Sequence, residues 1–129
     1  MTPELTYLVW SVALTVILVV VSAAGAQRQV GMAALAGNRE GAPELTGWAG
    51  RAIRAHRNML ENLVLFAILV LTCQAAGVRN SMTLLGAELF FWGRVAHAVC
   101  YILGLIWVRT LVFGVSVAGL VLLFVQLIR

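Results

Sequence analysis

Three polar side chains suited to binding a charged ligand share one face of a predicted helix. Arg54, Asn58 and Glu61 stand at i, i+4 and i+7, so a guanidinium, a carboxamide and a carboxylate lie on one stripe at 3.6 residues per turn. Arg57 lies four residues before Glu61 and borders this stripe. A stripe with both signs of charge is suited to a zwitterionic ligand. The alternative is a juxtamembrane turn whose arginines contact only lipid phosphates.

A second polar group lies further along the chain, inside an apolar segment. Arg94, His97 and Tyr101 stand at i, i+3 and i+7 and therefore share one helix face. Charged residues within an apolar span are costly unless they face protein or water, so we expect this face to point inward and to contact a ligand. A purely structural histidine is the simpler alternative for His97. Glu88, about two turns away, is predicted to be a structural partner or a boundary residue.

Four apolar segments must position these groups. We predict an all-α fold, an integral membrane four-helix bundle, formed by a single domain (1–129) with helices at about 5–26, 48–76, 81–104 and 107–128. The first segment has 22 uncharged residues, about 33 Å of helix, which matches a hydrocarbon core of about 30 Å. We expect Thr2 to cap the first helix, with Glu4 as a helix-start charge, and Asn80 or Ser81 to cap the third. In the long loop before the second helix, Arg39 could approach a ligand, although a surface role is simpler.

The composition is that of a membrane protein. Hydrophobic residues make up 62% of the chain and charged residues 11%, against roughly 25% charged in soluble domains, and the mean hydropathy is +0.98. Arginines at the ends of apolar segments favour lipid headgroups or a small anion and argue against nucleic acid as a partner. Cys73 and Cys100 lie in apolar segments without metal-like spacing, so we expect no disulfide and no metal site. Since no catalytic triad or acidic cluster is visible, a bound cofactor must supply most of the chemistry.

The arginines also predict an orientation in the membrane. Five arginines lie in the first loop and the start of the second helix, and Arg109 lies at the connection between the third and fourth helices. Only Arg79 and Arg129 lie on the opposite side. The positive-inside rule therefore predicts cytoplasmic connections and both termini outside. The absence of lysine and aspartate, with abundant alanine, glycine, valine and arginine, favours a GC-rich bacterial coding sequence, and hence a bacterial inner membrane.

Two ordered motifs carry a family resemblance. The first is Arg54-Ala-His-Arg-Asn-Met-Leu-Glu-Asn-Leu63, followed by Phe66, and the second is Phe91-Trp-Gly-Arg-Val-Ala-His-Ala-Val-Cys-Tyr101, followed by Arg109. They resemble the second-helix and third-helix signatures of the membrane-associated proteins in eicosanoid and glutathione metabolism, the MAPEG family. Their order, their separation and the length of the chain extend the resemblance over nearly all 129 residues.

The resemblance implies a homotrimer in the lipid bilayer that binds glutathione, as a co-substrate, between neighbouring subunits at the cytoplasmic side. Glutathione carries two carboxylates, an ammonium and a thiol, which suits paired arginine and glutamate side chains. The residues implied to bind it are Arg54, Arg57, Asn58, Glu61, Arg94, His97 and Tyr101. By the same resemblance, Arg109 lies beside the thiol, where a cation favours the reactive thiolate. A headgroup anchor is the alternative for Arg109.

The implied activity is that of a glutathione S-transferase or peroxidase, in which the thiolate attacks a lipophilic electrophile or hydroperoxide from the bilayer. A non-catalytic trimeric scaffold or regulator is the alternative, because some family members are not enzymes. A small multidrug exporter is disfavoured, because the first segment lacks the central glutamate of such proteins. Thr110 and Phe113 replace the serine and tyrosine of some members, and the interval from Tyr101 to Arg109 is one residue shorter than in some eicosanoid-forming members. Both departures argue against eicosanoid specificity.

Overall fold

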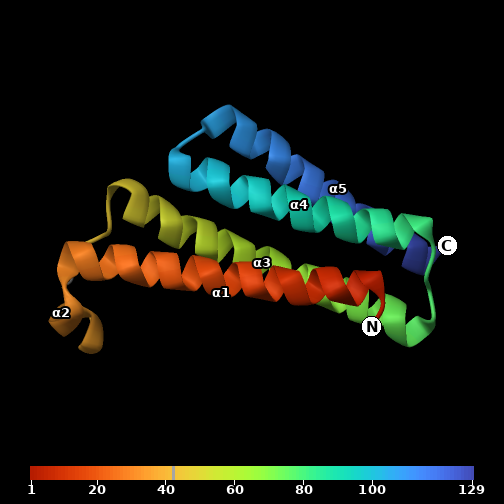
Figure 1. Cartoon of the computed structure of the whole chain (residues 1–129), viewed down its shortest axis with the longest axis horizontal. Helices are drawn as coiled ribbons and strands as arrows, with labels where there is room; N and C mark the ends of the chain where they lie inside the picture. Colours follow the sequence, from red (N-terminus) through yellow and green to blue (C-terminus); the bar gives the residue numbers. More distant parts are fainter. Residues whose placement is uncertain (42) are drawn as a thin grey trace.

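The computed structural model describes residues 1–41 and 43–129, and no strand occurs among them. The helices of this part of the chain are α1 (Pro3–Val30), α2 (Met32–Ala36), α3 (Gly47–Ala76), α4 (Ser81–Leu103) and α5 (Ile106–Ile128). The all-α prediction is therefore confirmed for the described residues. The four long helices run alongside one another, whereas the short α2 lies beyond the ends of α1 and α3 (Figure 1).

The arginine-rich α1–α3 loop and the α4–α5 turn, which Arg109 follows, lie at the same end of the molecule (Figure 1). Figure 1 shows the loop between α1 and α3 and the turn between α4 and α5 at one end, and both chain termini at the other. Helix α1 packs mainly on α3, and α4 packs mainly on α5. The two helix pairs contact each other chiefly through α4, which touches both α1 and α3.

Among the described residues, three helices, α1, α3 and α5, are long and apolar enough to cross a membrane by length and composition. Helix α4, expected as a fourth span, is not among them, although it has 23 residues. The physical reason is its content of ionisable side chains, because Glu88, Arg94 and His97 interrupt its apolar sequence. Arg94 and His97 are buried and Glu88 is half-buried, so the polar groups of α4 are covered largely by the other helices.

Local capping chemistry sets the helix ends. The Thr2 side chain accepts a hydrogen bond from Leu5 N, with Pro3 opening α1, and Asn80 caps α4 in a capping box with Thr83. Both predicted caps are confirmed. Helix α4 ends at Gly104, whose left-handed backbone (φ 80°) is accessible to glycine at little cost.

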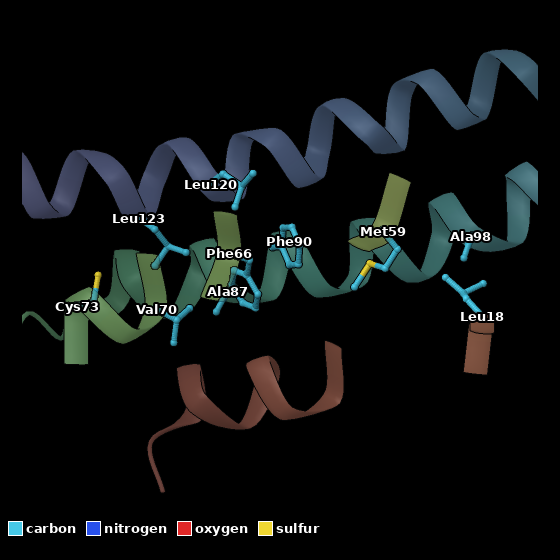
Figure 2. Packing of buried hydrophobic residues seen from close by; sticks show 10 residues of the cluster. All are labelled: Leu18, Met59, Phe66, Val70, Cys73, Ala87, Phe90, Ala98, Leu120 and Leu123. Carbon is cyan, nitrogen blue, oxygen red and sulfur yellow. The ribbon is translucent and has the colours of Figure 1, made fainter. Parts of the chain in front are cut away.

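An apolar core joins the four long helices (Figure 2). Phe66 of α3 stacks on Phe90 of α4 with ring centroids 4.0 Å apart, and both side chains are fully buried. Val70 and Leu123 extend this contact along α3 and α5 (Figure 2). Such aromatic contacts contribute about 0.5–1.5 kcal/mol beyond the burial of their area.

Small residues let α4 and α5 approach closely. A Cβ atom on Gly119 would fall 2.5 Å from the Gly86 carbonyl oxygen, and one on Gly93 would fall 2.9 Å from Ser116 N. No side chain fits at either position without a shift of the backbones. Close contact through small residues is a common means of helix association in membranes.

Glu4 has a further role that its position in the sequence did not predict. Glu4 is only 6% exposed, and its carboxylate oxygen Oε1 accepts a hydrogen bond from the Thr83 hydroxyl at 2.7 Å. The contact links the first turn of α1 to the first turn of α4. The expected helix-start charge is therefore also a tertiary contact at the end that holds the termini.

Candidate functional site

The polar stripe of α3 lies largely on the outer surface of the chain. Arg54 and Glu61 are exposed, and Asn58 between them is half-buried. Helix α3 is continuous here because the segment is rich in alanine, arginine and leucine, all good helix formers. Exposed apolar side chains, Leu60 and Val64, flank Glu61. A carboxylate among apolar groups is costly in a membrane, which favours a ligand or partner over this face.

One hydrogen bond joins the two sequence motifs. Arg94 Nη2 donates to Asn58 Oδ1 at 2.6 Å, linking α4 to α3. Arg94 is only 1% exposed, and its Nε and Nη1 atoms are buried without a partner among the described residues. The Arg94 guanidinium therefore reaches the surface of the site only through Asn58.

The same contact fixes the orientation of the Asn58 amide. Asn62 Nδ2 donates to the Asn58 carbonyl at 2.9 Å and lies 3.5 Å from Asn58 Oδ1. Because the donors of both Arg94 and Asn62 face Oδ1, the Nδ2 group of Asn58 points the other way. An amide held like this can donate to a ligand acceptor without first reorienting.

A second cluster forms where α4 meets α5. The Arg109 guanidinium lies 4.5 Å from the centroid of the Tyr101 ring, a cation–π contact. Tyr101 packs edge-on against His97, with centroids 5.5 Å apart, and His97 also contacts Phe113 at 6.0 Å. A cation–π contact at such a partly exposed site contributes about 0.5–1 kcal/mol. The cluster therefore holds a guanidinium, a phenol and an imidazole together.

Arg51 ties the two helix pairs together next to this cluster. Its Nε atom donates to the Ile102 carbonyl at 2.9 Å, in the last turn of α4. The carbonyls of a helix C-terminus lack intrahelical partners, so an arginine there is favourable both as a donor and toward the helix dipole. The sequence identified Arg51 only as one of the flanking arginines, because its partner is a backbone atom 51 residues away.

A cavity of about 460 Å³ lies at the same end of the molecule, beside α3. Arg54 and Arg57 line it together with Arg39 and Glu44 from the loop. Arg39 is exposed but faces this cavity, so the simpler prediction of a surface role describes only part of its position. No sequence pattern indicated a role for Glu44.

The predicted site residues thus form three sets within one chain. The first set is Asn58 with Arg94, joined by a hydrogen bond. The second is Tyr101 with His97 and Arg109, joined by aromatic and cation–π contacts. The third is Arg54 with Arg57, which both line the loop cavity. Glu61 makes no hydrogen bond to any residue that the structure describes. All three sets lie in the parts of α3, α4 and α5 that are nearer to the α1–α3 loop and the α4–α5 turn than to the chain termini.

The helical fold and the two motifs agree with the comparison by sequence. The sequence model of the MAPEG family matches residues 5–129. The chain therefore belongs to the MAPEG family, which confirms the resemblance seen in its motifs. This membrane family includes glutathione-dependent transferases and peroxidases as well as non-catalytic members. A search of curated proteins found no match.

Proposed function

We propose that this protein is a glutathione-dependent membrane enzyme, a transferase or peroxidase whose bound glutathione thiolate attacks a lipophilic electrophile or hydroperoxide. The observation that carries the proposal is the 2.6 Å hydrogen bond from Arg94 to Asn58, because it joins the two family motifs into one unit. The Tyr101–Arg109 contact supports it by adding a third polar element at the same end of the molecule.

The polar groups of α3 suit the charged ends of glutathione. Arg54 and Arg57 provide guanidinium donors for its carboxylates, and Glu61 provides a carboxylate for its ammonium. Asn58 donates through its oriented Nδ2 group. Arg94, buried on the side of Asn58 away from the ligand, orients the Asn58 amide through its hydrogen bond. His97 and Tyr101 line the side of the pocket that α4 forms.

Arg109 is the residue proposed to activate the thiol. A free thiol of the cysteine type has a pKa of about 8.5, and a neighbouring cation lowers this pKa because it stabilises the thiolate. The thiol proton passes to solvent. With a carbon electrophile, the thiolate sulfur then forms a bond to the electrophilic carbon, and the leaving group departs with its bonding electrons. With a hydroperoxide, the sulfur bonds to the outer oxygen while the O–O bond breaks, and the alkoxide that leaves takes a proton to become an alcohol. The thiol of a second glutathione then displaces the oxygen from the sulfenic acid as water and forms a disulfide.

A homotrimer completes the site in this proposal. Within one chain, Glu61 lies exposed beside apolar side chains and makes no hydrogen bond to any other predicted ligand-binding residue that the structure describes. A second copy placed over this face would cover the apolar side chains and enclose a ligand between subunits. Native mass measurement in mild detergent tests this arrangement, and a species that is only monomeric would contradict it.

The location follows from the arginines. We propose a bacterial inner-membrane protein whose site lies on the cytoplasmic side, with both termini outside. The support is the placement of the arginine-rich α1–α3 loop and the α4–α5 turn at one end and the termini at the other (Figure 1). Labelling of cysteines introduced at position 2 and position 38 of intact cells with an impermeant reagent tests this orientation, since only position 2 should react.

The direct test of the activity uses the detergent-purified full chain. Glutathione binding is measured by calorimetry, and conjugation is measured with a chlorodinitrobenzene-type electrophile and with a lipid hydroperoxide. Binding together with turnover of at least one substrate supports the proposal. Binding without turnover across several electrophiles and hydroperoxides would favour the non-catalytic scaffold, and the absence of both would refute a glutathione site.

A further inference from the structure

The segment between α1 and α3 is closed into a compact loop by one side chain. Gln29 Nε2 donates to the Thr46 carbonyl at 2.6 Å, and Thr46 N donates to Gln29 Oε1 at 2.9 Å. These two hydrogen bonds join the last turn of α1 to the residue that precedes α3. Compact loops whose ends are held together in this manner are frequently functional.

This loop forms one wall of the 460 Å³ cavity beside α3. The volume lies within the range of about 300–1,000 Å³ that is usual for small-molecule sites. Val30 of α1, Leu35 of α2 and Ile53 of α3 line it, and each is half-buried. Part of the cavity is therefore suited to a hydrocarbon group.

The charged lining of the cavity is predominantly positive. Three guanidinium groups, from Arg39, Arg54 and Arg57, oppose the single carboxylate of Glu44. Arg39 Nε donates to the Leu35 carbonyl at 3.1 Å, which ties the guanidinium to the end of α2. The backbone of Arg39 has φ 63°, a left-handed conformation that residues other than glycine seldom adopt. The hydrogen bond to α2 helps to hold this conformation.

We propose that this cavity binds an amphiphile with an anionic headgroup, either a phosphate or a carboxylate. Guanidinium groups bind both headgroups in a bidentate manner. A neutral lipid would leave the arginine side chains of the cavity without an anionic partner. A small inorganic anion would leave the apolar side chains of the cavity without a hydrocarbon group in contact with them. The membrane's own anionic phospholipid and a free anionic amphiphile share this chemistry. The cavity shares Arg54 and Arg57 with the proposed glutathione site, whereas Arg39 and Glu44 are not among the proposed glutathione residues. Substitutions of Arg39 and Glu44 therefore test the cavity separately from glutathione binding.

The test measures binding of dodecyl phosphate to the full chain purified in an uncharged maltoside detergent, by calorimetry and native mass spectrometry. We expect dodecyl phosphate to bind at least about tenfold more tightly than inorganic phosphate, because only the former uses the apolar wall. Equal affinity for the two would overturn the proposal. In nanodiscs, displacement of dodecyl phosphate by phosphatidylglycerol but not by phosphatidylcholine identifies the membrane lipid as the source. Binding insensitive to both lipids identifies a free amphiphile.

Substitutions of loop residues separate the cavity from general surface charge. Arg39→Gln is expected to weaken dodecyl phosphate binding at least about fivefold, whereas Arg79→Gln, at the exposed opposite end, should leave it unchanged. Glu44→Gln should strengthen binding, a gain that misfolding cannot produce. An unchanged affinity in Arg39→Gln, or an equal loss in both arginine variants, would overturn the proposal. Glutathione binding should be unchanged in Arg39→Gln, so failure of this site is distinguishable from failure of the glutathione site.

Discussion

Arg94→Met tests whether the buried guanidinium acts on glutathione through Asn58. Methionine retains an unbranched side chain but removes the donor that lies 2.6 Å from Asn58 Oδ1. A hydrogen bond from a charged donor contributes about 1.5–3 kcal/mol, and part of this is lost to reorganisation of the freed amide. We therefore expect glutathione to bind about tenfold more weakly, equivalent to about 1.4 kcal/mol.

The stability of Arg94→Met should change little, which separates this role from a structural one. Two of the three guanidinium nitrogens are buried without a partner among the described residues, so the charge itself is costly in the folded chain. Replacement of such a charge by an apolar group of similar size is often neutral or stabilising. We expect a thermal unfolding midpoint in detergent close to that of the parent.

A double-mutant cycle decides the matter. Glutathione affinity is measured for the parent, Arg94→Met, Asn58→Ala and the double variant. If Arg94 acts through Asn58, its replacement in the Asn58→Ala background should change affinity less than about twofold, giving a coupling energy of about 1 kcal/mol or more. Additive losses would refute the reasoning. A stability loss of about 3–5 kcal/mol in Arg94→Met would instead indicate a buried ion pair broken by the substitution.

Three further predictions follow from the contacts around the site. Glu61→Gln and Arg54→Ala should each weaken glutathione binding by about 10- to 150-fold, because each loses a charge-assisted contact. Calorimetry on the folded variants measures these affinities. If both variants bind glutathione as tightly as the parent, neither residue belongs to the glutathione site. Arg51→Ala should lower the free energy of unfolding by about 1 kcal/mol and reduce turnover more than glutathione affinity, since it frees the α4–α5 turn. Arg51→Lys keeps the charge, so a loss of stability equal to that of Arg51→Ala would argue against a charge effect. Gly119→Ala should destabilise the chain by about 1–3 kcal/mol because its Cβ would lie 2.5 Å from the Gly86 carbonyl oxygen. Gly114→Ala, with open space around it, should leave stability unchanged. Similar thermal unfolding midpoints for the two variants would contradict the close approach of α4 and α5.

Local features of the site were predictable from the sequence because they depend on helix periodicity. The order Arg54, Asn58, Glu61 specifies a stripe on any α-helix, and Thr2 and Asn80 are capping residues that act within four residues of themselves. The spacing alone did not indicate that Asn58 would contact α4, although the motifs that contain the two partners were identified.

Features that depend on how the helices pack were not predictable. The contact of Glu4 with Thr83 spans 79 residues, and that of Arg51 with Ile102 ends on a backbone carbonyl, which has no sequence signature. The loop cavity arises from the closure of the loop by Gln29, so its lining could not be read from a local pattern. The positions of the glycines in the sequence did not predict close helix packing either. Gly119 faces the backbone of α4, whereas no atom of another described helix lies near Gly114.

The pH dependence of thiolate absorbance for bound glutathione, in the parent and in Arg109→Ala, tests the proposed enzyme most directly. A cation beside the sulfur lowers the thiol pKa, so the thiolate signal of the parent should persist to lower pH than that of free glutathione. A lowering by 1 unit multiplies the thiolate present at pH 7 several-fold to about tenfold. Arg109→Ala should shift the titration back toward that of free glutathione while glutathione still binds, and Arg109→Lys should recover part of the shift. A parent titration identical to that of free glutathione, or one unchanged by Arg109→Ala, would contradict thiol activation by Arg109.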